Sequence, residues 1–194
     1  WRALESRDNI ELHVLLTGAH VSDDSAARAL LPPGAIGHTV GADMAGNSGA
    51  AVTASMASIL NDVGRIALRI SPDRALVIGD RLDMLPAALA LVPLNIPIIH
   101  LHGGELTYGA LDDRVRHAMT KLAHLHCAAT VDAATRLVRM GEESWRIRVT
   151  GAPGLDTLAE APVLDALSFA QAVGFDSLTG LRLVTVHPET NAAQ

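Results

Sequence analysis

The sequence predicts an α/β fold in which helices cover a parallel sheet, and three observations support this. Short apolar runs of strand length recur along the chain, and segments with helical spacing lie between them. Polar, ionisable residues directly follow two of these runs, in Gly79-Asp80-Arg81 and in residues 100–105. Because parallel α/β sheets bind ligands beyond the carboxyl ends of their strands, these clusters are candidate site residues.

The first part of the chain contains two predicted strands, one long helix and a turn. Residues 11–16 and 36–40 are apolar enough for short strands. A helix is expected to start after Ser48, because apolar residues then recur at helical spacing, namely Val52, Met56, Ile59, Leu60 and Val63. The Ser-Pro-Asp sequence at residues 71–73 predicts a turn.

The middle of the chain alternates between strands and helices. Strands are predicted at residues 75–78, 96–101, 126–129 and 146–150, and helices at residues 83–91, 111–123 and 132–140. Pro86 falls in the first turns of its helix, where proline is tolerated, and Gly141 is a usual helix-ending residue. In the helix predicted at residues 111–123, Val115, Met119 and Leu122 share one face. This order favours parallel strands joined by crossover helices.

A change of pattern divides the chain near residue 152. The spacing loosens over residues 153–162, which suggests a linker, and a helix near residues 164–173 and a strand at residues 181–186 would begin a second unit. We therefore expect one domain at residues 1–152, and a linker with the first elements of another domain at residues 153–194. Trp1 falls inside an element and nothing follows the last strand pattern, so we expect a fragment with sequence missing on both sides.

Composition excludes several classes of protein. No apolar run in the 194 residues reaches the roughly 18 residues of a membrane-spanning helix, and no signal-peptide pattern opens the chain. The net charge of −6 disfavours binding to nucleic acid or to an anionic membrane. Cys127 is the single cysteine, so no intrachain disulfide can form and a reducing, cytoplasmic location is expected. Walker-type and Gly-x-Gly-x-x-Gly phosphate loops and a Gly-x-Ser-x-Gly elbow are absent.

Asp80 is the first candidate catalytic residue. It follows an apolar strand and Gly79, which lets the backbone turn sharply. Asp is also a preferred N-cap residue, although Asp83 fits the cap of the next helix better. Arg81 can pair with either carboxylate or with a bound phosphate, and we expect it to contact the substrate.

The segment from His100 to Glu105 has more than one interpretation. His100 and His102 point to the same face if their strand continues. A His-x-His pair followed by acids can bind a transition metal, with Asp80 or Glu105 as further ligands. Gly103 and Gly104 let a ligand approach the backbone, where exposed N–H groups can accept an anion; the alternative is a flexible turn.

Asp112 and Asp113 open the helix that follows. The helix dipole favours negative charge in the first turn, which is one explanation of this pair. The other is acid–base chemistry, because basic neighbours can hold two carboxylates at different pKa values. These neighbours are Arg114, Arg116 and His117.

Two further strand ends carry candidate residues. Gly151 belongs to a glycine cluster that follows a predicted strand and can mark both a hinge and a wall of the site. His187 ends the last predicted strand, where it can face the first domain across a cleft. His124 and His126 are expected to be structural, and His13, His20 and His38 to be ordinary loop or strand residues.

Taken together, these residues resemble one family. The motifs that carry the resemblance are GDR-x-x-M at residues 79–84, NIPI-x-H-x-HGGE-x-T at 95–107, G-x-x-DD-x-x-RHA-x-TKL-x-H at 109–124, Met-Gly-Glu at 140–142 and V-x-GAPGLD at 149–156. They are similar to the hydrolysing UDP-N-acetylglucosamine 2-epimerases of bacterial sialic and legionaminic acid pathways. The resemblance extends from about Leu12 to His187.

The resemblance implies the N-terminal half of a two-domain GT-B fold, with a Rossmann-like parallel sheet, helices on both faces and the active site between the halves. It also implies that the chain lacks the first strand of this domain, with its basic loop, and most of the C-terminal domain. The partner would be a UDP-sugar, with neither nicotinamide nor a metal as cofactor. The resemblance leaves open whether the protein forms a homo-oligomer.

The implied reaction eliminates UDP and then hydrates the resulting glycal to the free 2-epimeric sugar. The family implies Asp80, Asp112 and Asp113 as acid–base groups and His187 as a residue from the second domain. Related epimerases carry Glu where this chain has His102, so Glu105 or His102 itself is expected to fill that role. The expected catalytic residues are Asp80, Glu105, Asp112, Asp113 and His187, and the expected substrate-binding residues are Arg81, His102, Gly103, Gly104, Arg116, His117 and Gly151.

Two alternatives to this function remain open from the sequence. The first is a metal-dependent hydrolase that uses His100, His102, Asp80 and Glu105. The second is a GT-B module that binds a nucleotide sugar or transfers a glycosyl group without epimerase chemistry.

Overall fold

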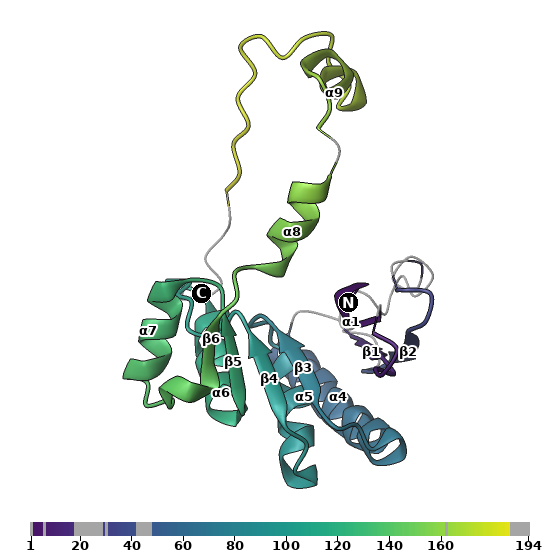
Figure 1. Ribbon diagram of the computed structural model, residues 1–194, viewed down its shortest axis with the longest axis vertical. Helices are drawn as coiled ribbons and strands as arrows, with labels where there is room; N and C mark the ends of the chain where they lie inside the picture. The colour runs from purple at the N-terminus through teal and green to yellow at the C-terminus, as the bar shows by residue number, and fades with distance from the viewer. Residues whose placement is uncertain are drawn as a thin grey trace.

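The computed structural model describes residues 2–5, 7–17, 29, 31–41, 48–161 and 163–186. Within these residues the strands form two parallel sheets, one four-stranded with the order β3-β4-β5-β6 and one two-stranded with β1 beside β2 (Figure 1). The strands are β1 His13–Leu16, β2 Ile36–Thr39, β3 Ala75–Ile78, β4 Ile98–Leu101, β5 Leu125–Ala128 and β6 Ile147–Val149. The predicted parallel α/β fold is confirmed.

Local sequence signals position the helices. The 22-residue helix α4, Gly49–Ile70, begins where Ser48 accepts a hydrogen bond from Ala51 N–H, and it ends at Ser71 in the left-handed region. Thr130 caps α7 in the same way, by accepting from Ala133 N–H. The remaining helices are α1 Arg2–Glu5, α5 Met84–Leu91, α6 Leu111–Leu122, α7 Val131–Arg139, α8 Pro153–Glu160 and α9 Ala166–Ala172.

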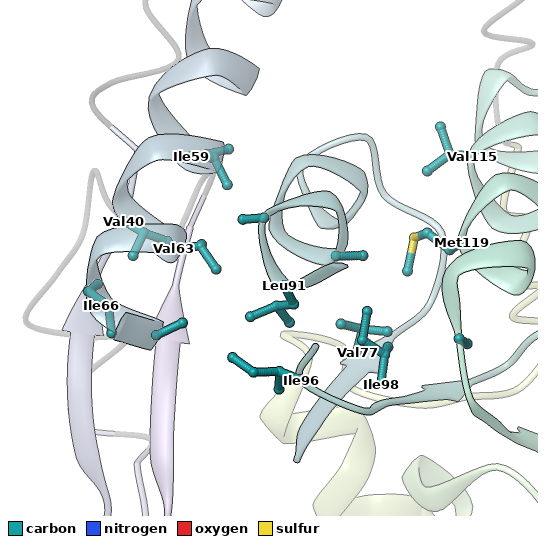
Figure 2. Packing of buried hydrophobic residues seen from close by; sticks show 14 residues of the cluster. Val40, Ile59, Val63, Ile66, Val77, Leu91, Ile96, Ile98, Val115 and Met119 are labelled. Carbon is teal, nitrogen blue, oxygen red and sulfur yellow. The ribbon is translucent and has the colours of Figure 1, made fainter. Parts of the chain in front are cut away.

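The helices α5 to α7 cover one face of the four-stranded sheet, and α4 packs against α5. Val77 and Ile98 lie on this face and pack in one core cluster with residues of α4, α5 and α6 (Figure 2). The main side chains of this cluster are Ile59, Val63, Ile66, Leu91, Val115 and Met119. Val40, just after β2, belongs to the same cluster, so α4 also joins the two sheets. Each such side chain contributes about 1.5–3 kcal/mol through burial.

The opposite face of the four-stranded sheet is less covered. Because side chains alternate along a strand, Leu76, Ile78 and Leu125 point away from the helices α4 to α7, and they are 39–50% exposed. The expected second layer of helices is therefore not found over these side chains among the described residues. Within the same residues, no helix is long and apolar enough to cross a bilayer.

One prediction for the last part of the chain is wrong. Residues 153–160, within the expected linker, form the helix α8, which begins at Pro153 because proline suits the first helical position, and the linker itself stays a prediction. Residues 181–186, predicted as a strand, have no regular structure. Their apolar pattern suits a strand, but a strand requires a hydrogen-bonded neighbour, and in the described part of the chain none pairs with them. Both α8 and α9 extend away from the sheet (Figure 1).

Candidate active site

The polar clusters that follow β3 and β4 lie side by side at one edge of the sheet. The parallel register pairs Ile78 with Leu101, so both strands end at the same level. The backbone continues this alignment, because Gly79 N–H donates to Leu101 O over 3.2 Å. Gly79 has a φ of +79°, a conformation that suits glycine, and it turns the chain so that Asp80 leaves the sheet. The predicted convergence of these strand ends is therefore observed.

Arg116 of α6 connects the two strand ends. Its side chain is only 3% exposed, and its Nη2 contacts the carboxylate of Asp80. Nη1 donates to Asp113 Oδ1 over 2.9 Å and to the main-chain oxygen of Glu105 over 2.8 Å. Nη2 also donates to Thr107 Oγ1 over 2.9 Å. One planar guanidinium thus holds groups from three separate segments, which is a geometry that lysine cannot reproduce.

The carboxylates around Arg116 remain accessible. The side chains of Asp80 and Asp113 are 28% and 26% exposed. Asp113 also accepts a hydrogen bond from Thr107 N–H over 3.0 Å, and its Oδ2 lies 3.6 Å from His117 Nε2. Charge-assisted hydrogen bonds of this kind are stronger than neutral ones, so the positions of both carboxylates are well defined. The cluster can present negative charge, and hence proton-transfer groups, at the solvent edge of the sheet.

His102 and Glu105 form a second pair next to this cluster. His102 Nδ1 lies 2.9 Å from Glu105 Oε1, and the two side chains are 26% and 38% exposed. His102 has a φ of +63°, which is strained for a residue other than glycine, and its N–H donates to Cys127 O over 3.1 Å. Strain of this type concentrates at functional sites, where surrounding contacts maintain it.

Gly103 and Gly104 are needed for packing. A Cβ added to Gly104 would lie 2.3 Å from the main-chain oxygen of Ala133 in α7, and its φ is +81°. The side chain of Arg136, one turn further along α7, contacts the Gly104 oxygen. Close approach of the loop to α7 therefore explains Gly104, while the predicted contact of both glycines with substrate stays a prediction.

His100, a predicted metal ligand in one of the alternatives, is fully buried. Its Nε2 donates to Gly79 O over 2.9 Å, and burial lowers the pKa of its imidazole, so the ring is neutral at neutral pH. No group of three His, Cys, Asp or Glu side chains that can hold a metal occurs among the residues that the structure describes. The four residues of the metal alternative do not gather as a ligand set.

Other predicted site residues lie further from these contacts. Asp112 is in the first turn of α6, but its carboxylate makes no hydrogen bond or ion pair with the residues that the structure describes. Arg81 is 71% exposed, with its Nε 3.4 Å from Asp83, which occupies the N-cap position of α5 without a side-chain cap bond. Gly151 follows β6, the strand farthest from β3 in the sheet. His187 lies outside the described residues.

Sequence reasoning did not identify Thr107 as a site residue. Its hydroxyl accepts from Arg116 and its N–H donates to Asp113. Its signals were its place after His102-Gly103-Gly104 and its position as the last defined residue of the motif at 95–107. Neither signal indicates which side chains a loop threonine contacts, so the contact emerges only in three dimensions.

Comparison with known proteins places the chain among nucleotide-sugar epimerases. Residues 2–194 match the family described as UDP-N-acetylglucosamine 2-epimerase. The "UDP-N,N'-diacetylbacillosamine 2-epimerase (hydrolyzing)" of Legionella pneumophila is 34% identical over 190 residues, which cover 96% of this chain and 50% of the relative. The "UDP-N-acetylglucosamine 2-epimerase" of Neisseria meningitidis is 32% identical over 169 residues, which cover 81% of this chain and 42% of the relative. The chain thus spans about half the length of these relatives.

Solved structures share the fold. The Neisseria meningitidis UDP-GlcNAc 2-epimerase bound to UDP-GlcNAc has a TM-score of 0.68 at 20% identity. The match covers 88% of this chain and 44% of the solved chain. The UDP-GlcNAc 2-epimerase of Methanocaldococcus jannaschii has a TM-score of 0.69 at 23% identity. This match covers 90% of this chain and 48% of the solved chain. Because the family match extends over residues 2–194 and the fold agrees with these structures, the chain belongs to the UDP-N-acetylglucosamine 2-epimerase family.

Proposed function

We propose that this protein is a hydrolysing nucleotide-sugar 2-epimerase. It would eliminate UDP from UDP-N-acetylglucosamine or a diacetamido relative and hydrate the resulting glycal to the free 2-epimeric sugar. The observation that carries the proposal is the cluster in which buried Arg116 holds the accessible carboxylates of Asp80 and Asp113 at a strand edge. Support for hydrolysis comes from relatives with "hydrolyzing" in their names, at 34% and 28% identity.

The reaction needs at least one base and one acid. A base removes the proton from the second carbon of the sugar while the bond from the anomeric carbon to UDP breaks, which leaves a double bond between the two carbons. Water then adds across this bond, so that a proton arrives on the opposite face of the second carbon and hydroxide on the first. We propose that these proton transfers use Asp80, Glu105, Asp112 and Asp113, with His187 contributed by a second domain.

Substrate contacts are assigned to the residues around these carboxylates. Arg81 is 71% exposed and can meet a diphosphate. His102, Gly103, Gly104 and His117 complete the set near the carboxylates, and Gly151, which follows β6 at the other side of the sheet, is proposed as a more distant contact. Arg116 was expected to contact the substrate as well. Since its guanidinium already holds four protein groups, we propose that it acts on the substrate through the carboxylates.

We further propose that a second domain is required for activity. The relatives are about twice as long as this chain, and a water-excluded site needs a second wall. On this view the active enzyme has a GT-B arrangement, residues 153–194 lead into its second domain, and the isolated 194-residue chain does not turn over substrate.

The proposed function is tested with the full-length natural protein in D₂O. UDP-N-acetylglucosamine and UDP-N,N'-diacetylbacillosamine are supplied separately, and UDP release and the sugar product are followed by NMR. We expect free 2-epimeric sugar with deuterium at the second carbon, because that carbon loses one proton and gains another from solvent. A UDP-linked epimer would instead indicate an epimerase that does not hydrolyse.

Two outcomes would refute the proposal and favour one of the alternative functions. UDP release without deuterium at the second carbon would point to a hydrolase or a glycosyl-transferring module, since neither breaks that C–H bond. Loss of activity after treatment with a chelator, with recovery on adding a divalent metal, would favour the metal-dependent alternative.

A further inference from the structure

His100 lies directly beneath the loop that carries Asp80. It belongs to β4, its exposed fraction is 0%, and its Nε2 lies 2.9 Å from Gly79 O. A carbonyl oxygen can only accept, so Nε2 carries the hydrogen and donates it. The bond therefore restrains the peptide group between Gly79 and Asp80, immediately before the candidate catalytic carboxylate.

The other side of the same imidazole meets the second site loop. A Cβ added to Gly103 would lie 3.0 Å from His100 Nδ1 and 3.4 Å from its Cε1, so the ring and the Gly103 backbone are already in close contact. Gly103 stands between His102 and Glu105 in the sequence. One ring thus separates the loop of Asp80 from the loop of the His102–Glu105 pair.

The environment of His100 argues against a role in proton transfer or metal binding. Nε2 is engaged by Gly79 O, and Nδ1 is buried without a hydrogen-bond partner among the described residues. Burial lowers the pKa of the ring, and the nearby charges of His126 and Arg116 act in the same direction, whereas the hydrogen bond to Gly79 O and the charge of Asp80 oppose them. A neutral imidazole with no atom at the surface has no route to a substrate, so its remaining contribution is geometric.

We propose that His100 is a positioning residue that sets the separation between the Asp80 loop and the His102–Glu105 loop. The inference rests on the proposed function, because it assumes that both loops act on one substrate. A displacement of about 1 Å between reacting groups can reduce the rate about 100-fold. The loss of the Gly79 hydrogen bond should therefore change kcat more than KM.

The test compares two amides at position 100 of the full-length protein. In His100→Gln, the side-chain amide can place its N–H near the position of Nε2 and reach Gly79 O. In His100→Asn, the same amide is one carbon shorter and falls short of it. We expect His100→Gln to keep kcat within about threefold of wild type and His100→Asn to lose about 10- to 100-fold in kcat, with KM changed less than about threefold.

His126 provides a matched control. It lies opposite His100 in the parallel register, is 1% exposed, and likewise donates from Nε2 while Nδ1 has no partner among the described residues. Its acceptor is Glu142, at 3.2 Å, and not a site loop. His126→Gln and His126→Asn should therefore lower stability against urea by amounts similar to those of the His100 variants, while kcat stays near wild type.

Two results would overturn the inference. One is equal kcat in His100→Gln and His100→Asn, and the other is an equal loss of kcat in His126→Asn and His100→Asn. If His100→Asn does not fold, His100→Met is compared with His100→Gln, because Met fills the space but has no donor. A wild-type protein that releases no UDP from either sugar would refute the proposed function instead, before any variant is compared.

Discussion

Two charged clusters in this protein are built with opposite polarity. In the Arg116 cluster (Asp80, Thr107, Asp113, Arg116), a cation that is 3% exposed holds two carboxylates that are 28% and 26% exposed. In the Glu142 cluster (Lys121, His126, Glu142, Arg146), a carboxylate that is 5% exposed is held by Lys121 at 2.7 Å, His126 at 3.2 Å and Arg146 at 3.7 Å. The accessible charge is negative in the first cluster and positive in the second, where Lys121 is 53% exposed.

This difference separates a cluster suited to chemistry from one suited to structure. A carboxylate that is oriented by a buried cation, yet reaches solvent, can exchange a proton with a bound molecule. Glu142 has no such access: burial would raise its pKa, but Lys121 and His126 outweigh that effect, so that its pKa is lowered and the group stays charged. It joins β5, α6 and the segment before β6. Similar residue types therefore have different uses, which depend on which partner is buried.

The largest expected effect follows from removing one accessible charge of the Arg116 cluster. In the full-length protein, Asp80→Asn should reduce kcat about 10³-fold, because an amide cannot transfer the proton, while the free energy of unfolding changes by less than about 1 kcal/mol. UDP release and urea unfolding measure the two quantities. Asp132→Asn, in the exposed first turn of α7, is the matched control and should leave kcat unchanged. Near-normal sugar release by Asp80→Asn would contradict the assignment.

Replacing the buried cation should change both activity and stability. Arg116→Lys keeps the charge but loses the fork that reaches two carboxylates, a carbonyl and a hydroxyl. We expect kcat to fall about 10- to 100-fold and the free energy of unfolding to fall by about 1–3 kcal/mol. Arg114→Lys, on the exposed side of the same helix, is the control. If both Lys variants behave like wild type, the Arg116 cluster does not organise the site.

The Glu142 cluster should respond in stability alone. Glu142→Gln removes the charge that Lys121, His126 and Arg146 share, and we expect a loss of about 1–3 kcal/mol in the free energy of unfolding, measured in urea. Substrate turnover at a temperature where the variant is folded should equal that of wild type. A selective loss of kcat in this variant would show that the two clusters do not divide chemistry and structure in this way.

The smallest expected effect concerns pH. Burial lowers the pKa of both His100 and His126 in the folded state, so the unfolded chain binds protons more readily as the pH falls below the ordinary histidine value of about 6.5. Stability should decline from there, by at most about 1.4 kcal/mol per pH unit for each histidine. The lowered pKa of Glu142 acts in another window, because its stabilisation is present above about pH 4.5 and is lost below it.

Urea unfolding at pH 7, 6 and 5 measures this slope. His126→Gln should make it shallower between pH 6.5 and 5, because one of the two buried imidazoles is gone. An unchanged slope in that variant would mean that His126 takes up a proton while the protein is folded.

Several elements were predictable because their signals are local. The strand Ala75–Ile78 forms as the apolar run predicted, and α4 starts after Ser48, where the cap predicts it. The place of Asp80 at a strand end follows from parallel topology alone. By contrast, the strand predicted at residues 181–186 depended on a neighbour that no local pattern can supply, and it does not form.

The amino-acid sequence by itself determined the order of strands and helices over residues 48–150, the common edge at which Asp80 and the segment of His102 and Glu105 lie, and the family. Hydrophobic periodicity and turn residues reflect steric effects and burial over a few neighbouring residues, so they can be read from a short stretch of sequence. The tertiary structure alone decided that Arg116 is buried among carboxylates, that His100 separates two loops, and that Glu142 is buried against Lys121, His126 and Arg146. These arrangements depend on contacts between residues distant in the chain. Such contacts determine which charged group is buried and which stays accessible, and a local sequence pattern does not show this.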